Sequence, residues 1–292
     1  VCSGILAAEG PSVYTVLQNL SIGSHTSKTF CASFAGLCDY PQVREYDLTF
    51  PSPKPEDKAR PPPSGQPPLR VAHISDTHVD LSYTPGSNYD CSKPICCRVY
   101  SEGDAPGNTS SPCGPFGNSN CDPPLGLEES MISAIEELNP AFSIYTGDVV
   151  AHDIWAVDKS EALADFNATY SLLDRLGLVY AAVGNHDTAP VNIFPASSSP
   201  ENQWAYDALY ADWRTLAPIA AASNEQQGSY SALDPSGTLR IISYNSIYYY
   251  TYNFAMYEDP RTYDPNGQFT WLIIELDEAE RANQRVWLIA HI

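Results

Sequence analysis

Basic residues are scarce in this sequence. Its 292 residues include 15 Lys and Arg against 35 Asp and Glu, which gives a formal net charge of −20. A surface with that excess of negative charge repels the phosphate backbone of nucleic acids, so we expect no nucleic-acid partner. An acidic surface also suits a protein that works at low pH, where part of the negative charge is titrated.

Long apolar runs are missing as well. No stretch of about 18 apolar residues occurs, so no membrane span is predicted. The sequence opens at Val1 and Cys2 without the basic segment of a signal peptide, and it does not begin with Met. We therefore expect a chain that is processed or cut from a longer one. Hydrophobic residues make up 43% of it, enough for the core of one large domain, with or without a small module.

Cysteine, in contrast, occurs eight times. Three Asn-X-Ser/Thr sequons are present, at Asn19, Asn108 and Asn167. Disulfides and N-glycans both form along the secretory route, so we expect glycosylation at these sites and a secreted protein or one in a lysosomal or vacuolar lumen. A metal knuckle at Cys91, Cys96 and Cys97 is the alternative, but the surrounding loop-like stretch carries a sequon and argues against it.

The first 45 residues have the spacing of short helices. Two apolar series repeat every three or four residues: Tyr14, Leu17 and Leu20, then Phe30, Phe34 and Leu37. Cys31 and Cys38 lie two helical turns apart on roughly one face, without an evident partner in the segment. We predict a small, disulfide-dependent helical module at 1–45 and a linker at 46–69, where eight prolines exclude helix and central strand.

Residues 70–292 alternate between strand-like and helix-like segments. The expected strands lie within 69–74, 141–148, 178–187, 239–245 and 285–292, the last of them read as a buried strand. One expected helix spans 126–138, with Leu127, Met131, Ile135 and Leu138 on one face. Two others carry Leu163, Phe166, Tyr170 and Leu173, and Phe269, Leu272, Ile273 and Leu276. Strands that alternate with helices predict a layered α/β domain with short, buried strands.

Residues able to bind a metal follow the apolar core of each expected strand. They are Asp76 and His78, Asp148, Asn185 and His186, Asn245, and His291. In open α/β sheets, sites form beyond the carboxyl ends of the strands, so these residues can converge. Oxygen and imidazole ligands without a thiolate suit zinc, iron or manganese. Each signal alone is more typical of a turn than of a ligand, and it is their combination that predicts a metal site. One carboxylate, such as that of Asp148, can bridge two cations.

The combination DTH, GD and GNHD resembles the calcineurin-like metallophosphoesterase superfamily. The segments HISDTHVDLSY, CSKPICC, YTGDVVAHDIW, GNHDTAPVNIFP and LRIISYNS are similar to the acid sphingomyelinase (sphingomyelin phosphodiesterase) family. Residues 1–45, with VCSGIL and FCASFAGLC, look like the second half of a saposin-like domain. The resemblance implies a layered β-sandwich flanked by helices at 70–292, preceded by a small all-α remnant and the linker.

The same resemblance implies roles for individual residues. Asp76, His78 and Asp148 would bind one metal, and Asp148, Asn185 and His291 the other. His186 and His152 would lie beside the substrate phosphate, with His186 as the acid. A Gly-His-X-His segment expected after His291 lies beyond this sequence. The implied disulfides are Cys91–Cys96 and Cys97–Cys121, the partners of Cys2, Cys31 and Cys38 would lie upstream, and Cys113 is left without an account.

The implied function is hydrolysis of sphingomyelin to ceramide and phosphocholine by a water that bridges two divalent cations, with zinc as the expected metal. The saposin-like helices would contact the sphingolipid and the membrane surface, and the protein is expected to be a monomer. Two alternatives stay open: a phosphodiesterase for nucleotides or other soluble phosphoesters, and a non-catalytic lipid-binding protein.

Overall fold

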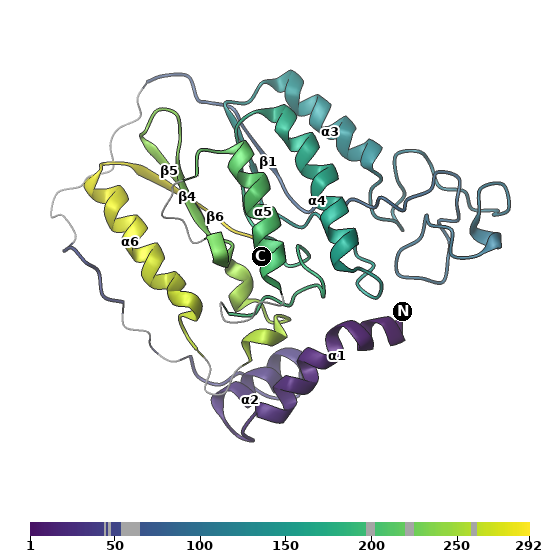
Figure 1. Cartoon of the computed structure of the whole chain (residues 1–292), viewed down its shortest axis with the longest axis horizontal. Coiled ribbons are helices and arrows are strands. Elements are labelled where there is room, and N and C mark those ends of the chain that lie inside the picture. The colour runs from purple at the N-terminus through teal and green to yellow at the C-terminus, as the bar shows by residue number, and fades with distance from the viewer. Residues whose placement is uncertain (44, 46–47, 54–64, 197–201, 220–224, 258–261) are drawn as a thin grey trace.

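The computed structural model describes residues 1–43, 45, 48–53, 65–196, 202–219, 225–257 and 262–292. The helices are α1 (Cys2–Asn19), α2 (His25–Phe30), α3 (Leu125–Leu138), α4 (Lys159–Leu173), α5 (Gln203–Leu216) and α6 (Gln268–Arg281). The strands are β1 (Val71–Ile74), β2 (Phe142–Tyr145), β3 (Val179–Ala181), β4 (Tyr230–Leu233), β5 (Leu239–Ser243) and β6 (Arg285–Ile289). The strands lie between α3, α4 and α5 on one side and α6 on the other (Figure 1). The predicted α/β class is confirmed; α5 and β4 had not been predicted.

The first sheet contains β1, β2 and β3, all parallel, in that order. Its strands are in register at their carboxyl ends, where Ile74 pairs with Tyr145 and Tyr145 with Ala181. Strands β2 and β3 are buried along their whole length, which agrees with their mostly apolar sequences, interrupted only by Ser143. The loops that follow the three strands therefore start at the same edge.

The second sheet contains β4, β5 and β6, with β5 antiparallel to β4 and parallel to β6. Because Ser243 pairs with Ile289, the chain leaves both β5 and β6 at one edge of this sheet. The expectation of a buried final strand is wrong for most of β6: Trp287 is 43% and Leu288 is 53% exposed, and only Ile289 is buried. The strand lies at the edge of its sheet, so no described strand covers its outer side.

Helix α3 is present where predicted, but its predicted apolar face is partly wrong. Leu127 and Leu138 are exposed, while Ile132 and Glu128 are buried. The buried face of α3 can include Glu128 because the carboxylate of Glu128 accepts a hydrogen bond from the hydroxyl of Thr169 in α4, 3.0 Å away. A search for apolar residues at helical spacing cannot identify a helix face that contains a buried carboxylate.

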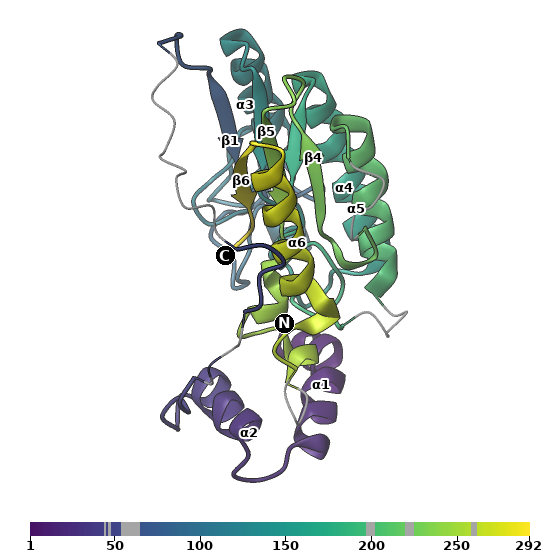
Figure 2. The ribbon, with the colours of Figure 1, turned by 90° about the vertical axis from the view of Figure 1, so that its left-hand side faces the viewer.

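Helices α1 and α2 form a module that lies apart from the sheets, below the body in Figure 2. Val16 and Phe30 join it to the body by packing against Ile193, Phe254 and Tyr257. The other apolar residues of the two predicted series behave differently: Tyr14, Leu17, Phe34 and Leu37 are exposed. Among the described residues, no helix has both the length and the apolar character needed to cross a membrane.

The expectation that Cys31 and Cys38 have partners upstream is wrong, because the structure joins them to each other with a Cα–Cα distance of 5.5 Å. A π-helical turn at Cys31–Ala35 and a left-handed Gly36, with φ of 64°, turn the chain back on itself. Cys2 is free and exposed. In the predicted linker, residues 46–47 and 54–64 lie outside the described part, and the rest of 46–69 contains neither helix nor strand.

Candidate metal centre

The loops after β1 and β2 are paired through their backbones just beyond the edge of the first sheet. The N–H groups of Asp76 and His78 donate to the carbonyls of Gly147 and Asp148, both at 3.0 Å. Asp76, His78 and Asp148 all have positive φ, of 56°, 39° and 62°. Such backbone conformations are uncommon for these residues and are often found where function requires a particular geometry. Here they turn three side chains toward one point.

Asp76, His78 and Asp148 form the first predicted ligand set, and the structure brings them together. One ligand atom from each lies within 4.8 Å of the other two. Nε2 of His78 is 3.9 Å from Oδ1 of Asp76 and 3.5 Å from Oδ2 of Asp148. The Nδ1–H of His78 donates to the carbonyl of Val150 at 2.8 Å, which leaves the lone pair on Nε2 facing the two carboxylates.

Asp148, Asn185 and His291 form the second predicted set, and they converge as well. Nε2 of His291 is 3.0 Å from Oδ1 of Asn185 and 3.3 Å from Oδ2 of Asp148. The Nδ1–H of His291 donates to the carbonyl of Thr146 at 2.8 Å, so its Nε2 also points inward. This bond links the end of the second sheet to the end of the first. Oδ2 of Asp148 thus faces ligand atoms of both sets, the arrangement of a bridging carboxylate.

Two glycines allow the loops after β2 and β3 to approach this closely. A β-carbon on Gly184 would lie 2.1 Å from Oδ1 of Asp148, and one on Gly147 would lie 2.3 Å from the backbone nitrogen of Gly184. Neither position has room for a side chain. The glycines of the GD and GNHD motifs are therefore required by the packing of the two loops.

Asp187, the last residue of the GNHD motif, is fully buried and holds the same two loops together. Its carboxylate accepts hydrogen bonds from the backbone N–H groups of Asp148, Val149 and Gly184, at 3.1, 2.8 and 2.7 Å. Burial raises the pKa of this carboxyl group. The contacts place Asp187 behind the ligands, as a positioning residue.

A cluster of imidazoles lies beside the first ligand set. The ring centroids of His152 and His78 are 3.8 Å apart, and the ring of His186 is 4.8 Å from His78 and 4.7 Å from His152. His186 is held by its backbone, which donates to Oδ1 of Asp148 at 2.8 Å. Its Nδ1 is buried without a hydrogen-bond partner among the described residues. Burial lowers the pKa of His186 to about 4.

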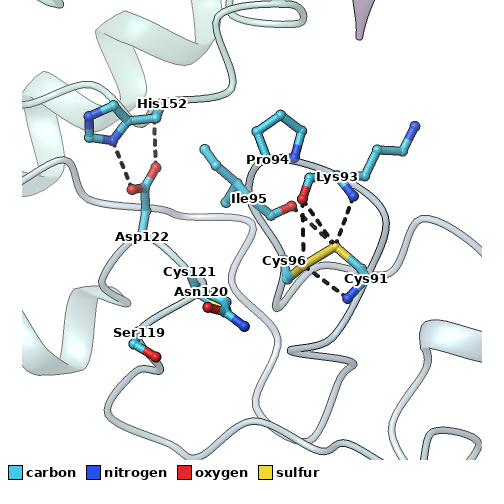
Figure 3. A pocket seen from close by; sticks show the side chains of 10 residues that line it. All are labelled: Cys91, Lys93, Pro94, Ile95, Cys96, Ser119, Asn120, Cys121, Asp122 and His152. Carbon is cyan, nitrogen blue, oxygen red and sulfur yellow. Dashed lines mark hydrogen bonds and ion pairs between the residues drawn. A yellow bond between two sulfur atoms is a disulfide. The ribbon is translucent and has the colours of Figure 1, made fainter.

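Asp122 is a site residue that sequence reasoning missed. Its carboxylate accepts from the backbone N–H of His152 at 2.6 Å and lies 2.9 Å from Nδ1 of the same residue (Figure 3). This hydrogen bond raises the pKa of His152, so that ring keeps its proton to higher pH. The one sequence signal was its place directly after Cys121, in a loop expected to be anchored by a disulfide.

The remaining predicted residues lie outside the centre. Asn245 is fully buried, and its amide donates to the hydroxyl of Tyr206 and to the carbonyl of Gln227, so it supports the fold. Disulfides join Cys91 to Cys96 and Cys97 to Cys121, the pairing implied by the resemblance. Cys113 is free and buried beside Tyr83. The sequon residues are exposed: Asn19, Asn108 and Asn167.

Several known proteins are similar to this chain in sequence. The chain is 31% identical over 306 residues to sphingomyelin phosphodiesterase B of Dictyostelium discoideum, which covers 100% of the chain and 46% of that protein. It is 35% identical over 231 residues to sphingomyelin phosphodiesterase of Homo sapiens, covering 76% of the chain and 36% of the relative. Acid sphingomyelinase-like phosphodiesterase 3b of Homo sapiens is 33% identical over 238 residues, covering 77% of the chain and 48% of the relative.

The chain thus spans less than half the length of each of these relatives. A family model described as calcineurin-like phosphoesterase matches residues 69–289, which include the whole candidate centre except His291. The chain therefore belongs to the calcineurin-like phosphoesterase family.

Proposed function

We propose that this protein is a metal-dependent phosphodiesterase that hydrolyses sphingomyelin to ceramide and phosphocholine. The observation that carries the proposal is the carboxylate of Asp148, whose Oδ2 faces His78 on one side and His291 on the other. Two imidazoles without a place in either ligand set, His152 and His186, lie beside it. The relatives named sphingomyelin phosphodiesterases supply the substrate class.

The donor set fits divalent cations, and we propose Zn²⁺ as the metal. Two Nε2 atoms, three carboxylate or amide side chains and no thiolate suit zinc bound through nitrogen and oxygen. Asp76 and His78 would hold the first ion, Asn185 and His291 the second, and Asp148 both. Two such ions, when bound, lower the pKa of a water and neutralise charge on a phosphate. Both histidines are held in the tautomer that this needs by backbone carbonyls.

The residues of the chain supply the remaining functions. His152, whose protonated form Asp122 favours, binds the phosphate as a cation. His186 protonates the leaving alkoxide through a ring nitrogen. The pKa of its imidazole is low in the free protein because of burial, and the negative charge of a phosphodiester beside it raises that pKa. Asp187 holds the loops that carry Asp148 and His186 at a constant distance.

The helical module is proposed to be the second half of a saposin-like domain, which contacts lipid. Its exposed side includes large apolar residues, among them Leu6, Tyr14, Leu17, Ile22, Phe34 and Leu37. Exposed apolar surface of this kind marks a partner or membrane surface. Exposed sequons and three disulfides support a glycoprotein that is secreted or resides in a lysosomal or vacuolar lumen.

The test compares the release of phosphocholine from sphingomyelin with hydrolysis of a soluble bis-aryl phosphate. We expect sphingomyelin to be preferred and both activities to be lost with a chelator. A preference for soluble esters would favour the second candidate, a phosphodiesterase for nucleotides or other soluble phosphoesters. Lipid binding without turnover of either substrate would favour the non-catalytic candidate.

A second experiment separates metal binding from proton transfer. His186→Ala should reduce turnover about 100- to 10,000-fold, the usual contribution of a general acid, because the variant removes the proposed proton donor. The amount of bound metal should stay at the wild-type level, since His186 belongs to neither ligand set. Equal losses of metal and of turnover would remove His186 from this role.

A further inference from the structure

The loops after β1 and β2 are joined by backbone contacts at their start, and the last of these is a parallel bridge between Val79 and Val150. In the described part of the chain, no backbone hydrogen bond joins residues 151–157 to the loop after β1. His152 lies in this segment, and its ring centroid is 3.8 Å from that of His78. The place of His152 beside the metal ligands therefore depends on side chains.

The side chain of Arg98 bridges the two loops beyond their backbone contacts. Its Nε–H donates to Asp80, two residues after His78, at 2.8 Å. One of its terminal N–H groups donates to Asp153, which follows His152 directly. The guanidinium group is planar and rigid, so it binds two carboxylates in fixed directions, which the single flexible ammonium group of a lysine does not. Arg98 therefore sets the distance between the segments that follow the two histidines.

The bridge removes three charged groups from water, because Arg98, Asp80 and Asp153 are all buried. Oδ1 of Asp153 has no hydrogen-bond partner among the described residues, and the third nitrogen of Arg98 lies 3.9 Å from a carboxylate oxygen of Glu161 in α4. Buried ion pairs often contribute no more stability than apolar side chains of the same size. They do restrict the arrangement, since a displacement leaves a charge buried and unpaired.

A disulfide connects Arg98 to the other group that holds His152. Arg98 directly follows Cys97, and Asp122 directly follows Cys121. The two cysteines form a bridge with a Cα–Cα distance of 5.7 Å. Asp122 binds the backbone and the ring of His152, and Arg98 binds the next residue. Both contacts to this segment therefore start from one covalently joined pair of strands of the chain.

We propose that Arg98 is a positioning residue, which sets the place of His152 relative to the metal ligand His78. The inference rests on the proposed function, in which His152 binds the substrate phosphate. Arg98 belongs to neither ligand set. His78 is joined to Asp148 by a backbone hydrogen bond, so these ligands keep their places when Arg98 is replaced. Loss of the bridge then lowers turnover without loss of metal.

The first test is Arg98→Lys, which keeps the charge and removes one of the two directed bonds. We expect kcat to fall about 10- to 100-fold, the usual effect of losing a group that orients a functional side chain, and bound metal to stay at the wild-type level. Arg240→Lys is the matched control, because Arg240 is a similarly buried arginine that binds Glu275 of α6 and Gln284, outside the centre. It should leave kcat unchanged. An unchanged kcat in Arg98→Lys would overturn the proposal.

A double-mutant cycle separates an action through His152 from a general effect on the fold. In a His152→Ala background, Arg98→Lys should lower kcat no further, because the residue that Arg98 positions is already absent. An equal fold loss in both backgrounds would overturn the proposal. If Arg98→Lys is too unstable to purify, Arg98→Met combined with Asp80→Asn and Asp153→Asn removes the bridge without leaving a buried charge, and the same expectations apply.

The position of His152 is also measurable without turnover. Its ring protons lie in the ring current of His78, and their NMR resonance is identified by its loss in His152→Ala. At a fixed pH, Arg98→Lys should move this resonance and Arg240→Lys should not. A resonance that Arg98→Lys does not move would overturn the proposal. Absence of turnover on every ester would defeat the proposed function, and the NMR result would still decide whether Arg98 positions His152.

Discussion

Asp122 holds His152 at two points, through the backbone N–H at 2.6 Å and through Nδ1 of the ring at 2.9 Å. The contact to the backbone fixes the position of the residue, and the contact to the ring fixes the orientation of the imidazole and favours its protonated form. Nε2 of His152 is thereby directed to the cluster it forms with His78 and His186. A carboxylate from the segment between β1 and α3 thus positions a residue from the loop after β2.

Asp122→Asn should lower kcat about 10- to 100-fold, the usual effect of losing an orienting partner. Because Asp122 raises the pKa of His152, its loss should also move the alkaline limb of the pH profile of kcat/KM to lower pH. Bound metal should be unchanged. Asp90→Asn, an exposed carboxylate of the same loop, is the control. An unshifted pH limb would show that Asp122 acts on the fold alone.

Asp148→Asn should lower the metal content of the chain more than either Asp76→Asn or His291→Ala. Asp148 faces ligand atoms of both sets, and the other two residues serve one set each. Metal per chain is measured by mass spectrometry after dialysis against buffered zinc, with circular dichroism to confirm folding. The proposal that Asp148 binds both metals is wrong if the Asp148 variant retains as much metal as the His291 variant.

Gly184→Ala should destabilise the protein by about 1–3 kcal/mol and abolish activity, because the new β-carbon would lie 2.1 Å from Oδ1 of Asp148. Gly126→Ala in α3 is the matched control, since no atom lies within 4 Å of the β-carbon it would add. Chemical denaturation gives both free energies of unfolding. Similar stabilities for the two variants would contradict the close approach of the loops.

The protein should become more stable as pH falls from 8 toward 5. Burial first, and then the nearby carboxylates of Glu161, Asp153 and Asp80, raise the pKa of Asp165 to about 8. An unfolded Asp titrates near about 3.9, so between these two values the folded state keeps a proton that the unfolded state releases. That difference stabilises the fold at low pH and is lost as pH rises through 8.

Asp165→Asn should therefore be more stable than wild type at pH 7.5, by about 1–3 kcal/mol, and similar to it at pH 4. Asp174→Asn, at an exposed position after α4, is the control. Thermal unfolding across this range gives both curves. A gain for Asp165→Asn that is equal at the two pH values would reject titration as its cause.

Leu17→Ser should reduce hydrolysis of sphingomyelin in vesicles and leave soluble esters unaffected, because Leu17 is exposed and supports no core. Val16→Ser, at the buried neighbouring position, should instead destabilise the contact between the module and the body. Vesicle co-sedimentation and denaturation distinguish the two effects. If the Leu17 variant hydrolysed sphingomyelin in vesicles at the wild-type rate, the proposal that the helical module contacts lipid would be wrong.

Much of the fold and of the candidate centre could be predicted from local sequence. Alternating strand and helix segments indicate an α/β domain, and parallel strands in register bring their carboxyl ends to one edge. The strand ends therefore indicated a group of candidates that included Asn245, and the resemblance to a known family reduced it to Asp76, His78, Asp148, Asn185 and His291. Each of these five lies within four residues of the end of a strand, so its position depends on the strand that precedes it.

Other features depend on contacts between distant segments, and only the tertiary structure decided them. Asp122 reaches His152 across 30 residues, β6 is exposed because it lies at a sheet edge, and Glu128 is buried by a bond to α4. The pairing of Cys31 with Cys38 depends on a π-helical turn and a left-handed glycine that helical spacing does not predict. The periodicity of apolar residues predicts which residues form each strand and helix. Which of their side chains come into contact depends on how those elements pack against one another.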